Sequence, residues 1–198
     1  MPEKEVVQVD LGSACRLLHP MHTVLVSCVG KRGKPNIITL AWAMPTSISP
    51  PLVAVSIAPR RHSHGLIEES KEFVVNVPTM RILDAAMFCG RRSGKEYDKF
   101  KETGLTAQPA RKVKAPIIKE CVAHLECTLH NQFTTGDHTV FVGEIVEAYA
   151  DKRAYVDGYD LKKAKMVFHL GGSEFATLDP KIIKPKLPRT KKARTHKR

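Results

Sequence analysis

A short basic turn between two apolar segments carries the side chains best suited to binding an anion. It reads Arg60-Arg61-His62-Ser63-His64 and supplies two fixed positive charges and a hydroxyl. We expect Ser63 to be the N-cap of a helix that ends near Ser70. Free N–H groups at a helix N-terminus, next to arginines, form a phosphate-type anion site. The same residues also fit an ordinary solvated turn.

A second polar bend, Gly136-Asp137-His138, separates two segments with strong β propensity. A histidine in such a bend can project toward a ligand, and its imidazole exchanges a proton near neutral pH. His138 is therefore a candidate functional group, and a plain turn residue is the alternative.

Cys121, His124, Cys127 and His130 recur at every third position and have the ligand types of a zinc site. On a strand, the period of two places the cysteines on one face and the histidines on the other. We therefore predict no metal site. The sequence contains no GxGxxG, GxSxG or HExxH motif. These observations favour a cofactor that carries its own chemistry.

Length and composition predict one ordinary globular domain. The chain has 198 residues, 42% of them hydrophobic, and no apolar run approaches the roughly 18 residues that cross a bilayer. The N-terminus lacks the basic and apolar pattern of a secretory signal. The five cysteines are odd in number and irregularly spaced, which is typical of reduced thiols. We expect a cytoplasmic protein with no membrane partner.

The formal net charge of +12 is concentrated at the C-terminal end. Lys181–Arg198 contains nine Lys or Arg and no acidic residue, which leaves +3 for residues 1–180. We predict a folded domain over 1–180 and a basic, disordered tail over 181–198. Such a tail either contacts nucleic acid non-specifically or only keeps the protein in solution.

Apolar and β-branched segments bounded by turn residues predict a mainly β protein with few helices. We expect a possible edge strand at Val6–Val9 and short helices at Ser13–Leu18, at Met80–Cys89, capped by Thr79 and ended by Gly90, and around Lys95–Glu102. The predicted main strands are Thr23–Val29, Asn36–Ala43, Leu52–Ala58, Phe73–Val77, Cys121–Leu129, Val140–Tyr149 and Val167–Leu170. Between the fifth and sixth of these we expect a turn over residues 131–138. Many short strands indicate a closed or sandwich-like β architecture.

Several short motifs occur together in one order along this chain. They are Asn36…Ala41-Trp42-Ala43…Thr46-Ser47-Ile48-Ser49-Pro50-Pro51-Leu52-Val53, Arg60 to His64, Phe73-Val74-Val75-Asn76-Val77, Asp98-Lys99-Phe100, Gly136-Asp137-His138 and His169-Leu170-Gly171-Gly172. In this order they resemble the flavin reductase-like proteins, which include the flavoredoxins. The resemblance covers roughly Arg16 to Leu178. It implies a Greek-key-like, FMN-binding split β-barrel that forms a homodimer with the FMN sites at or near the subunit contact.

The resemblance also implies a set of cofactor-binding residues. Arg60, Ser63 and His64 would bind the FMN phosphate. Ala41, Trp42 and Ala43, with Thr46 and Ser47, would lie along the isoalloxazine ring. Cys89, Gly90 and Lys99 match stretches that approach the cofactor or the dimer contact. His138 matches a histidine at the flavin face where a nicotinamide stacks, and is the catalytic candidate.

The function implied is that of an FMN-dependent oxidoreductase. Electrons would pass from NADH, NADPH or a reduced partner through FMN to a small-molecule or protein acceptor. One alternative is an FMN electron carrier with no NAD(P)H activity. Another is a basic β-barrel adaptor that binds RNA through its tail and holds no flavin.

Overall fold

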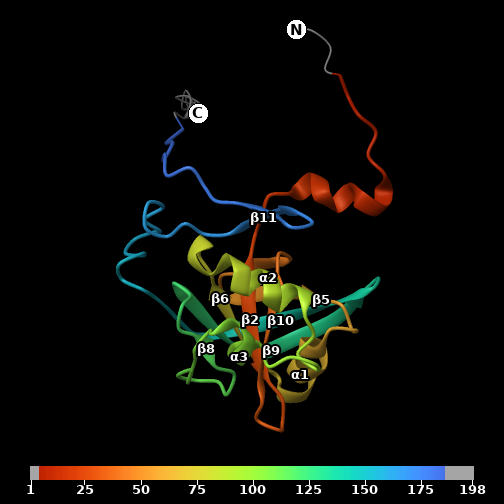
Figure 1. Cartoon of the computed structure of the whole chain (residues 1–198), viewed down its shortest axis with the longest axis vertical. Coiled ribbons are helices and arrows are strands. Elements are labelled where there is room, and N and C mark those ends of the chain that lie inside the picture. Colours follow the sequence, from red (N-terminus) through yellow and green to blue (C-terminus); the bar gives the residue numbers. More distant parts are fainter. Residues whose placement is uncertain (1–4, 186–198) are drawn as a thin grey trace, which may run out of the picture.

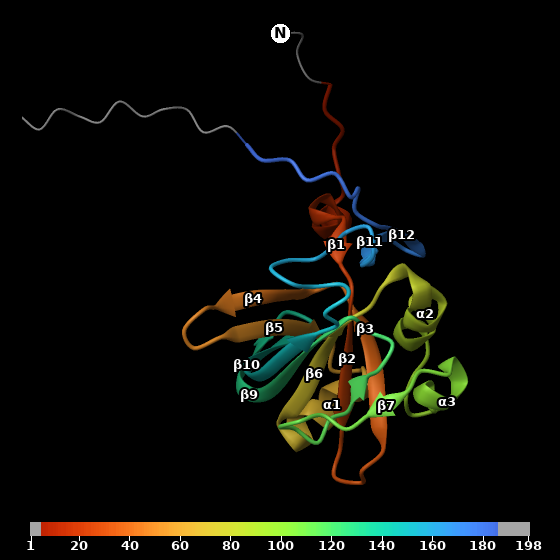
Figure 2. The ribbon, with the colours of Figure 1, turned by 90° about the vertical axis from the view of Figure 1, so that its left-hand side faces the viewer.

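A curled seven-stranded antiparallel sheet forms the centre of the molecule in the computed structural model, which describes residues 5–185 (Figures 1 and 2). The strand order is β3-β2-β6-β9-β10-β5-β4. The strands are β2 (Val24–Val29), β3 (Pro35–Leu40), β4 (Ala43–Ser47), β5 (Leu52–Ile57), β6 (Glu72–Val77), β9 (Ala123–Thr135) and β10 (His138–Ala150). β3 also approaches β5, so the sheet curves toward closure. The predicted mainly β architecture is confirmed.

Strand β2 lies between two apolar layers, and all six of its residues are buried. Alternate side chains of a strand point to opposite faces. Val26 packs inside the curled sheet with Phe73 and Phe141, whereas Leu25 packs against the outer helical layer with Ala86. Burial of each such large apolar side chain stabilises the fold by about 1.5–3 kcal/mol.

Helices cover the sheet on two sides. α1 (His62–Ser70) contributes Ile67 to the interior cluster, and α2 (Leu83–Arg91), preceded by the 3-10 turn η2 (Met80–Ile82), packs on β3 together with α3 (Lys99–Thr103). Two helix-end predictions are wrong. The N-cap position of α1 is Arg61, not Ser63. Gly90 does not end α2, which continues through Arg91.

Two predictions about strand ends, over residues 36–43 and 131–138, are wrong. The predicted strand over 36–43 is broken: β3 ends at Leu40, and Ala43 already belongs to β4. Ala41 and Trp42 form the bend between these strands, and the Trp42 carbonyl accepts a hydrogen bond from the Ser56 N–H at 3.0 Å. The predicted turn over 131–138 is much shorter, because β9 and β10 extend until only Gly136 and Asp137 separate them.

A small second sheet joins the two ends of the chain. It has the order β1-β11-β12, formed by β1 (Met21–His22), β11 (Phe168–Gly171) and β12 (Glu174–Ala176). The 3-10 helix η1 (Leu11–Leu18) leads into it from the N-terminal side (Figure 2). The predicted edge strand at 6–9 is wrong, because that segment has no regular structure. Residues 181–185 also have none, and the rest of the predicted tail, 186–198, lies outside the described residues.

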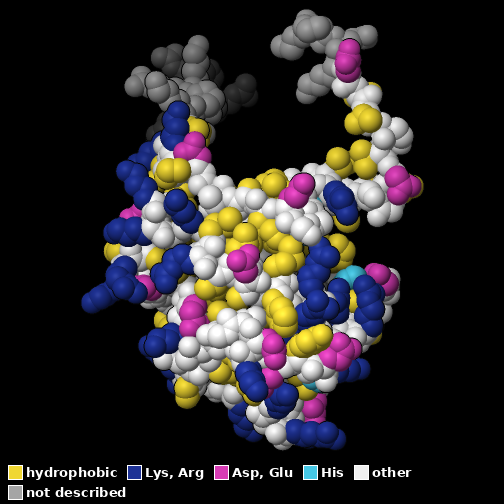
Figure 3. All heavy atoms as spheres, in the orientation of Figure 1, with side chains coloured by type: hydrophobic (Ala, Val, Ile, Leu, Met, Phe, Trp, Pro, Cys, Tyr) yellow, Lys and Arg dark blue, Asp and Glu magenta, His cyan; other side chains and the backbone are white. Residues whose placement is uncertain are grey.

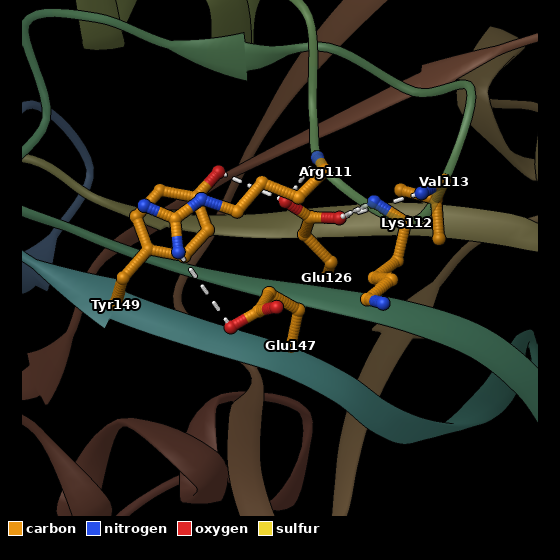
Figure 4. Close-up of polar contacts among 6 residues, drawn as sticks. All are labelled: Arg111, Lys112, Val113, Glu126, Glu147 and Tyr149. Atoms are coloured by element: carbon orange, nitrogen blue, oxygen red, sulfur yellow. Dashed lines mark hydrogen bonds and ion pairs between the residues drawn. The ribbon is translucent and has the colours of Figure 1, made fainter.

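A buried carboxylate anchors the segment that contains β7 (Ala107–Gln108) and β8 (Ile117–Ile118) (Figure 4). Glu126 on β9 is completely buried and accepts hydrogen bonds from the backbone N–H groups of Arg111, Lys112 and Val113 and from the Tyr149 hydroxyl. Burial opposes ionisation of Glu126, but these hydrogen bonds outweigh it and lower its pKa. The segment is therefore held to the sheet by a charged group.

Among residues 5–185, no helix is both long and apolar enough to cross a bilayer. The same part of the chain contains no group of three or more His, Cys, Asp or Glu that could hold a metal ion. All five cysteines are free thiols.

Candidate functional site

A cleft of about 540 Å³ opens between the ends of β3 and β5, helix α2 and the small sheet β1-β11-β12. Its charged or ionisable lining residues are Arg16, His19, Arg61, Arg91, His138 and His169, together with the thiol Cys15. No Asp or Glu of the described part of the chain lines it. The cleft therefore combines cationic groups with apolar walls, which suits a planar organic anion.

The floor of the cleft is built where α2 lies close to β3. Ile38, Thr39 and Leu40 of β3 face Ala86 and Gly90 of α2 across it. Glycine favours this approach, because a Cβ at Gly90 would lie 3.2 Å from the Thr39 Cβ, which is a tight contact. The Thr39 hydroxyl also donates a hydrogen bond to the Ala86 carbonyl. The floor is consequently a rigid strand-to-helix contact.

Thr23 contributes an unusual polar atom to the same cleft. Its side chain is 1% exposed, and its hydroxyl oxygen has no hydrogen-bond partner among the described residues. A buried hydroxyl without a partner costs about 1–3 kcal/mol. A ligand atom in the cleft would remove that cost, so Thr23 is a candidate contact that the sequence did not indicate.

A smaller cavity of about 140 Å³ continues from the cleft, sharing Ile38, Arg61 and Gly90 with it. The cationic residues that line it are Arg60, Arg61, Arg92 and Lys99, and no Asp or Glu within residues 5–185 lines it. The backbone at Gly94 passes close to the Asn36 side chain in this cavity, since a Cβ at Gly94 would collide with that side chain. We call this cavity the basic chamber.

Lys99 holds the basic chamber together from inside. It is 4% exposed, and its Nζ donates to the carbonyls of Ile37 and Cys89, both at 2.7 Å. Burial lowers the pKa of Lys99. Burial and the neighbouring Lys95 and Lys99 charges also lower the pKa of His62. The ammonium group of Lys99 has three donors, so one remains for an anion in the chamber.

Ser63 and His64 point into the protein. The Ser63 hydroxyl lines the basic chamber but accepts a hydrogen bond from Asn36 Nδ2 at 2.7 Å. His64 lines neither cavity. Its Nε2 lies 2.9 Å from the Thr139 hydroxyl, and its Nδ1 lies 3.3 Å from Glu68 Oε2. The contacts with Asn36 of β3 and Thr139 of β10 tie α1 to the sheet, whereas Glu68 belongs to α1 itself. Of the two, only Ser63 lies where it could reach a phosphate.

Trp42 and His138 face one another at one end of the cleft. Their ring centroids are 4.9 Å apart with an interplanar angle of 41°, and Trp42 is 40% exposed. His138 Nδ1 lies 2.6 Å from Asp137 Oδ1, and this hydrogen bond lowers the pKa of Asp137. The ionised carboxylate orients the imidazole. Ala41 and Trp42 of the bend and His138 thus line the same cleft.

The other predicted residues are more scattered. Ala43, Thr46 and Ser47 lie on the edge strand β4 and line neither cavity. Cys89 lines the basic chamber, but burial raises the pKa of its thiol to about 11, so it is not a nucleophile. Gly90 lines both cavities.

Comparison with known proteins adds independent information. A family model described as "Flavin reductase like domain" matches residues 16–169. An uncharacterized protein of Archaeoglobus fulgidus is 41% identical over 170 residues, which cover 85% of this chain and 94% of that protein. The NADH-dependent FAD reductase of Streptomyces globisporus is 32% identical over 103 residues, covering 52% of this chain and 56% of that protein.

The fold is also shared with a solved structure. Flavoredoxin of Desulfovibrio vulgaris (Miyazaki F) superposes with a TM-score of 0.77 at 30% identity, over 84% of this chain and 91% of that one. The predicted split barrel is thereby confirmed. Since the family model spans most of the sequence, the chain belongs to the flavin reductase-like family.

Proposed function

We propose that this protein binds FMN and transfers electrons from NAD(P)H or a reduced partner to an acceptor. The observation that carries the proposal is the pair of connected cavities, one wide and partly apolar, the other small and cationic. FMN has the same two parts, a flat ring system and a phosphate. Similarity to a flavoredoxin and to an NADH-dependent FAD reductase supports this assignment.

The phosphate would lie in the basic chamber. A phosphate monoester carries about −1.5 to −2 charges at neutral pH. Arg60, Arg61, Arg92 and Lys99 line the chamber, and no acidic residue that the structure describes lines it with them. Charge-assisted hydrogen bonds of this kind are about twice as strong as neutral ones. The chamber is a better fit to a phosphate than to any uncharged group.

The ring system would lie in the main cleft, and the residues present fit it. The unpartnered Thr23 hydroxyl offers a hydrogen bond to a polar edge, and Ile38 and Ala41 offer apolar and backbone surface. When bound, FMN supplies hydride acceptance and one- or two-electron release, which no side chain here can supply. The protein's own part is to orient the ring, keep water from it and position a proton.

His138 is the residue that we assign to proton handling or substrate orientation. It lines the cleft, and Asp137 holds its Nδ1 at 2.6 Å, which leaves Nε2 as the nitrogen available to a ligand. Its ring packs against Trp42 at a centroid distance of 4.9 Å. A positioned imidazole contributes about 10²–10⁴-fold to proton transfers.

The alternative of an FMN electron carrier without NAD(P)H activity is kept because the solved relative cited above is a flavoredoxin. In that case the flavin would exchange electrons only with a protein partner.

We also propose that the protein is a homodimer. Large apolar side chains are exposed on β4 and just after it, where Met44 is 62% and Ile48 is 95% exposed. Hydrophobic side chains are also exposed along the segment before η1, at the upper right of Figure 3. Exposed apolar surface of this kind marks interaction sites. Because Trp42 links the cleft to β4, dimer formation and flavin binding would be coupled.

One experiment tests the proposed function. Protein stripped of cofactor is titrated with FMN, and the flavin absorbance and fluorescence are followed. The FMN-loaded protein is then mixed anaerobically with NADH or NADPH in a stopped-flow instrument. Saturable 1:1 binding followed by bleaching of the flavin bands is the expected result. Binding without bleaching would indicate the carrier, and no binding at all would overturn the proposal.

A further inference from the structure

Two distant parts of the chain meet above the cleft. The β1–β11 pairing sets Met21 opposite His169 and His22 opposite Phe168. It thereby brings η1 beside the β11–β12 hairpin, and Figure 1 shows both above α2. The run from His169 to Gly172 belongs to this hairpin, and three of its four residues line the cleft. The proposed flavin contacts do not use this end of the cleft.

Aromatic rings form a wall along this end. His19 and His169 pack edge to face with centroids 5.1 Å apart, and His169 and Phe175 lie 5.2 Å apart at 41°. His19 Nδ1 is 2.9 Å from the His169 carbonyl oxygen, so the wall is braced by the backbone. All three residues line the cleft. Such rings offer a flat surface for stacking another planar group.

Two arginines flank the wall. Arg16 lies beside Gly171, where a Cβ would come within 3.6 Å of Arg16 Nη1. Within residues 5–185 Arg16 makes no ion pair. Arg91 donates to the Ser173 hydroxyl at 2.6 Å and to the Gly172 carbonyl at 3.3 Å. Its bonds fix the hairpin, whereas Arg16 keeps all its donors for a ligand.

These charges are separate from the proposed phosphate site. The basic chamber is lined by Arg60, Arg61 and Arg92, and neither Arg16 nor Arg91 lines it. Among residues 5–185 no carboxylate lines the cleft, so no described group in its wall neutralises these arginines. A second anionic group, distinct from the FMN phosphate, would therefore be attracted to this end.

We infer that Arg16, His19, Arg91, His169 and Phe175 form a terminal subsite for the molecule that exchanges electrons with the flavin. The inference rests on the proposed function and specifies its substrate class: a planar ring that carries an anionic group. Two sources share that chemistry, a nicotinamide nucleotide with its phosphate and an aromatic carboxylate. Arg16 selects for the anion, and the aromatic wall holds the ring.

The test compares Arg16→Gln with Arg81→Gln on FMN-loaded protein. Arg81 is exposed on η2 and lines none of the cavities described here, so its variant controls for loss of one positive charge. The first arm titrates 4-hydroxybenzoate against its amide and follows perturbation of the flavin absorbance. The second arm measures flavin reduction by reduced nicotinamide mononucleotide against the phosphate-free 1-methyl-dihydronicotinamide.

In at least one arm we expect the anion to be preferred over its neutral analogue by about tenfold, the effect of one charge-assisted hydrogen bond. Arg16→Gln should abolish that preference, and Arg81→Gln should keep it. The arm that shows the preference identifies the source of the anion. Equal behaviour of the two variants, or no preference in either arm, overturns the inference.

A titration with FMN alone separates this result from the proposed function. Both variants should bind FMN as the unmodified protein does, because neither Arg16 nor Arg81 lines the basic chamber. Failure of all three proteins to bind FMN would overturn the proposed function, and the inference with it. Normal FMN binding without anion preference overturns the inference alone.

Discussion

Replacing Glu126 by Gln should destabilise the protein strongly, although the substitution only exchanges one carboxylate oxygen for an NH₂ group. The carboxylate accepts N–H groups at 2.8 Å from Arg111, 2.6 Å from Lys112 and 3.3 Å from Val113, and the Tyr149 hydroxyl at 2.9 Å (Figure 4). A Gln side chain has one acceptor oxygen, and its NH₂ group would face backbone donors. At least one buried N–H then loses its partner.

The magnitude follows from these contacts. Hydrogen bonds to a charged group are worth about 1.5–3 kcal/mol each, and Gln loses roughly two of them. The free energy of unfolding should therefore fall by about 3–6 kcal/mol. For a chain of this size each kcal/mol shifts the melting temperature by about 2–4 °C. We expect a decrease of roughly 10 °C in a thermal melt followed by circular dichroism.

The pH dependence gives a second readout. The folded-state pKa of Glu126 is lowered, so its contribution is complete above the unfolded pKa of about 4.3 and is lost as pH falls through the folded value. The difference in melting temperature between Glu126→Gln and the unmodified protein should be largest at neutral pH and shrink in acid. FMN affinity at low temperature should stay unchanged, because neither Glu126 nor Arg111–Val113 lines the cleft or the basic chamber.

Glu120→Gln is the matched control. Both Glu120 oxygens accept one backbone N–H, that of Thr106, at 3.2 and 3.0 Å, but this site is exposed. Water can replace a lost bond there, so the cost should stay within about 1 kcal/mol. Equal melting temperatures for Glu120→Gln and Glu126→Gln, or a difference that does not shrink in acid, would refute the reasoning.

Four further outcomes are expected. Arg60→Ala should weaken FMN binding about 10- to 100-fold in a fluorescence titration, through loss of one charge-assisted phosphate contact, and should leave the reduction rate of bound flavin intact. His138→Ala should slow that reduction by roughly ten- to a hundredfold in stopped-flow traces without loss of FMN; the opposite pattern would contradict its assignment. Deletion of Leu187–Arg198 should leave FMN affinity and melting temperature unchanged and lower retention on an RNA column, and a large fall in melting temperature would contradict the tail boundary. Sedimentation equilibrium of the flavin-loaded protein should give a dimer, and a monomer at micromolar concentration that retains FMN would contradict the coupling of assembly and binding.

The sequence by itself determined most strands of the central sheet and the chemical character of the site. Segments such as β2 and β6 are apolar, rich in β-branched residues and bounded by turn residues, so they can be predicted as strands locally. The basic turn at Arg60 and Arg61 and the histidine after Gly136-Asp137 were also evident, because charge and turn chemistry are local properties. The order of motifs identified the family, and through it the split barrel.

Tertiary structure decided which of these residues share a cavity. Ser63 and His64 belong to the predicted phosphate turn, but the packing of α1 directs them to Asn36 and Thr139. No local pattern encodes which face of a nine-residue helix is buried when its apolar stripe is weak. Ala43 likewise left the predicted strand because the chain bends after Leu40 to cross to β5.

Long-range pairing decided the rest. Lys99 reaches the basic chamber through carbonyls of β3 and α2, and His19 meets His169 across 150 positions in sequence. Such contacts depend on strand order and helix packing, which short-range patterns do not contain. The types of the site residues are therefore a property of the sequence, whereas their convergence at one cleft is a property of the folded sheet.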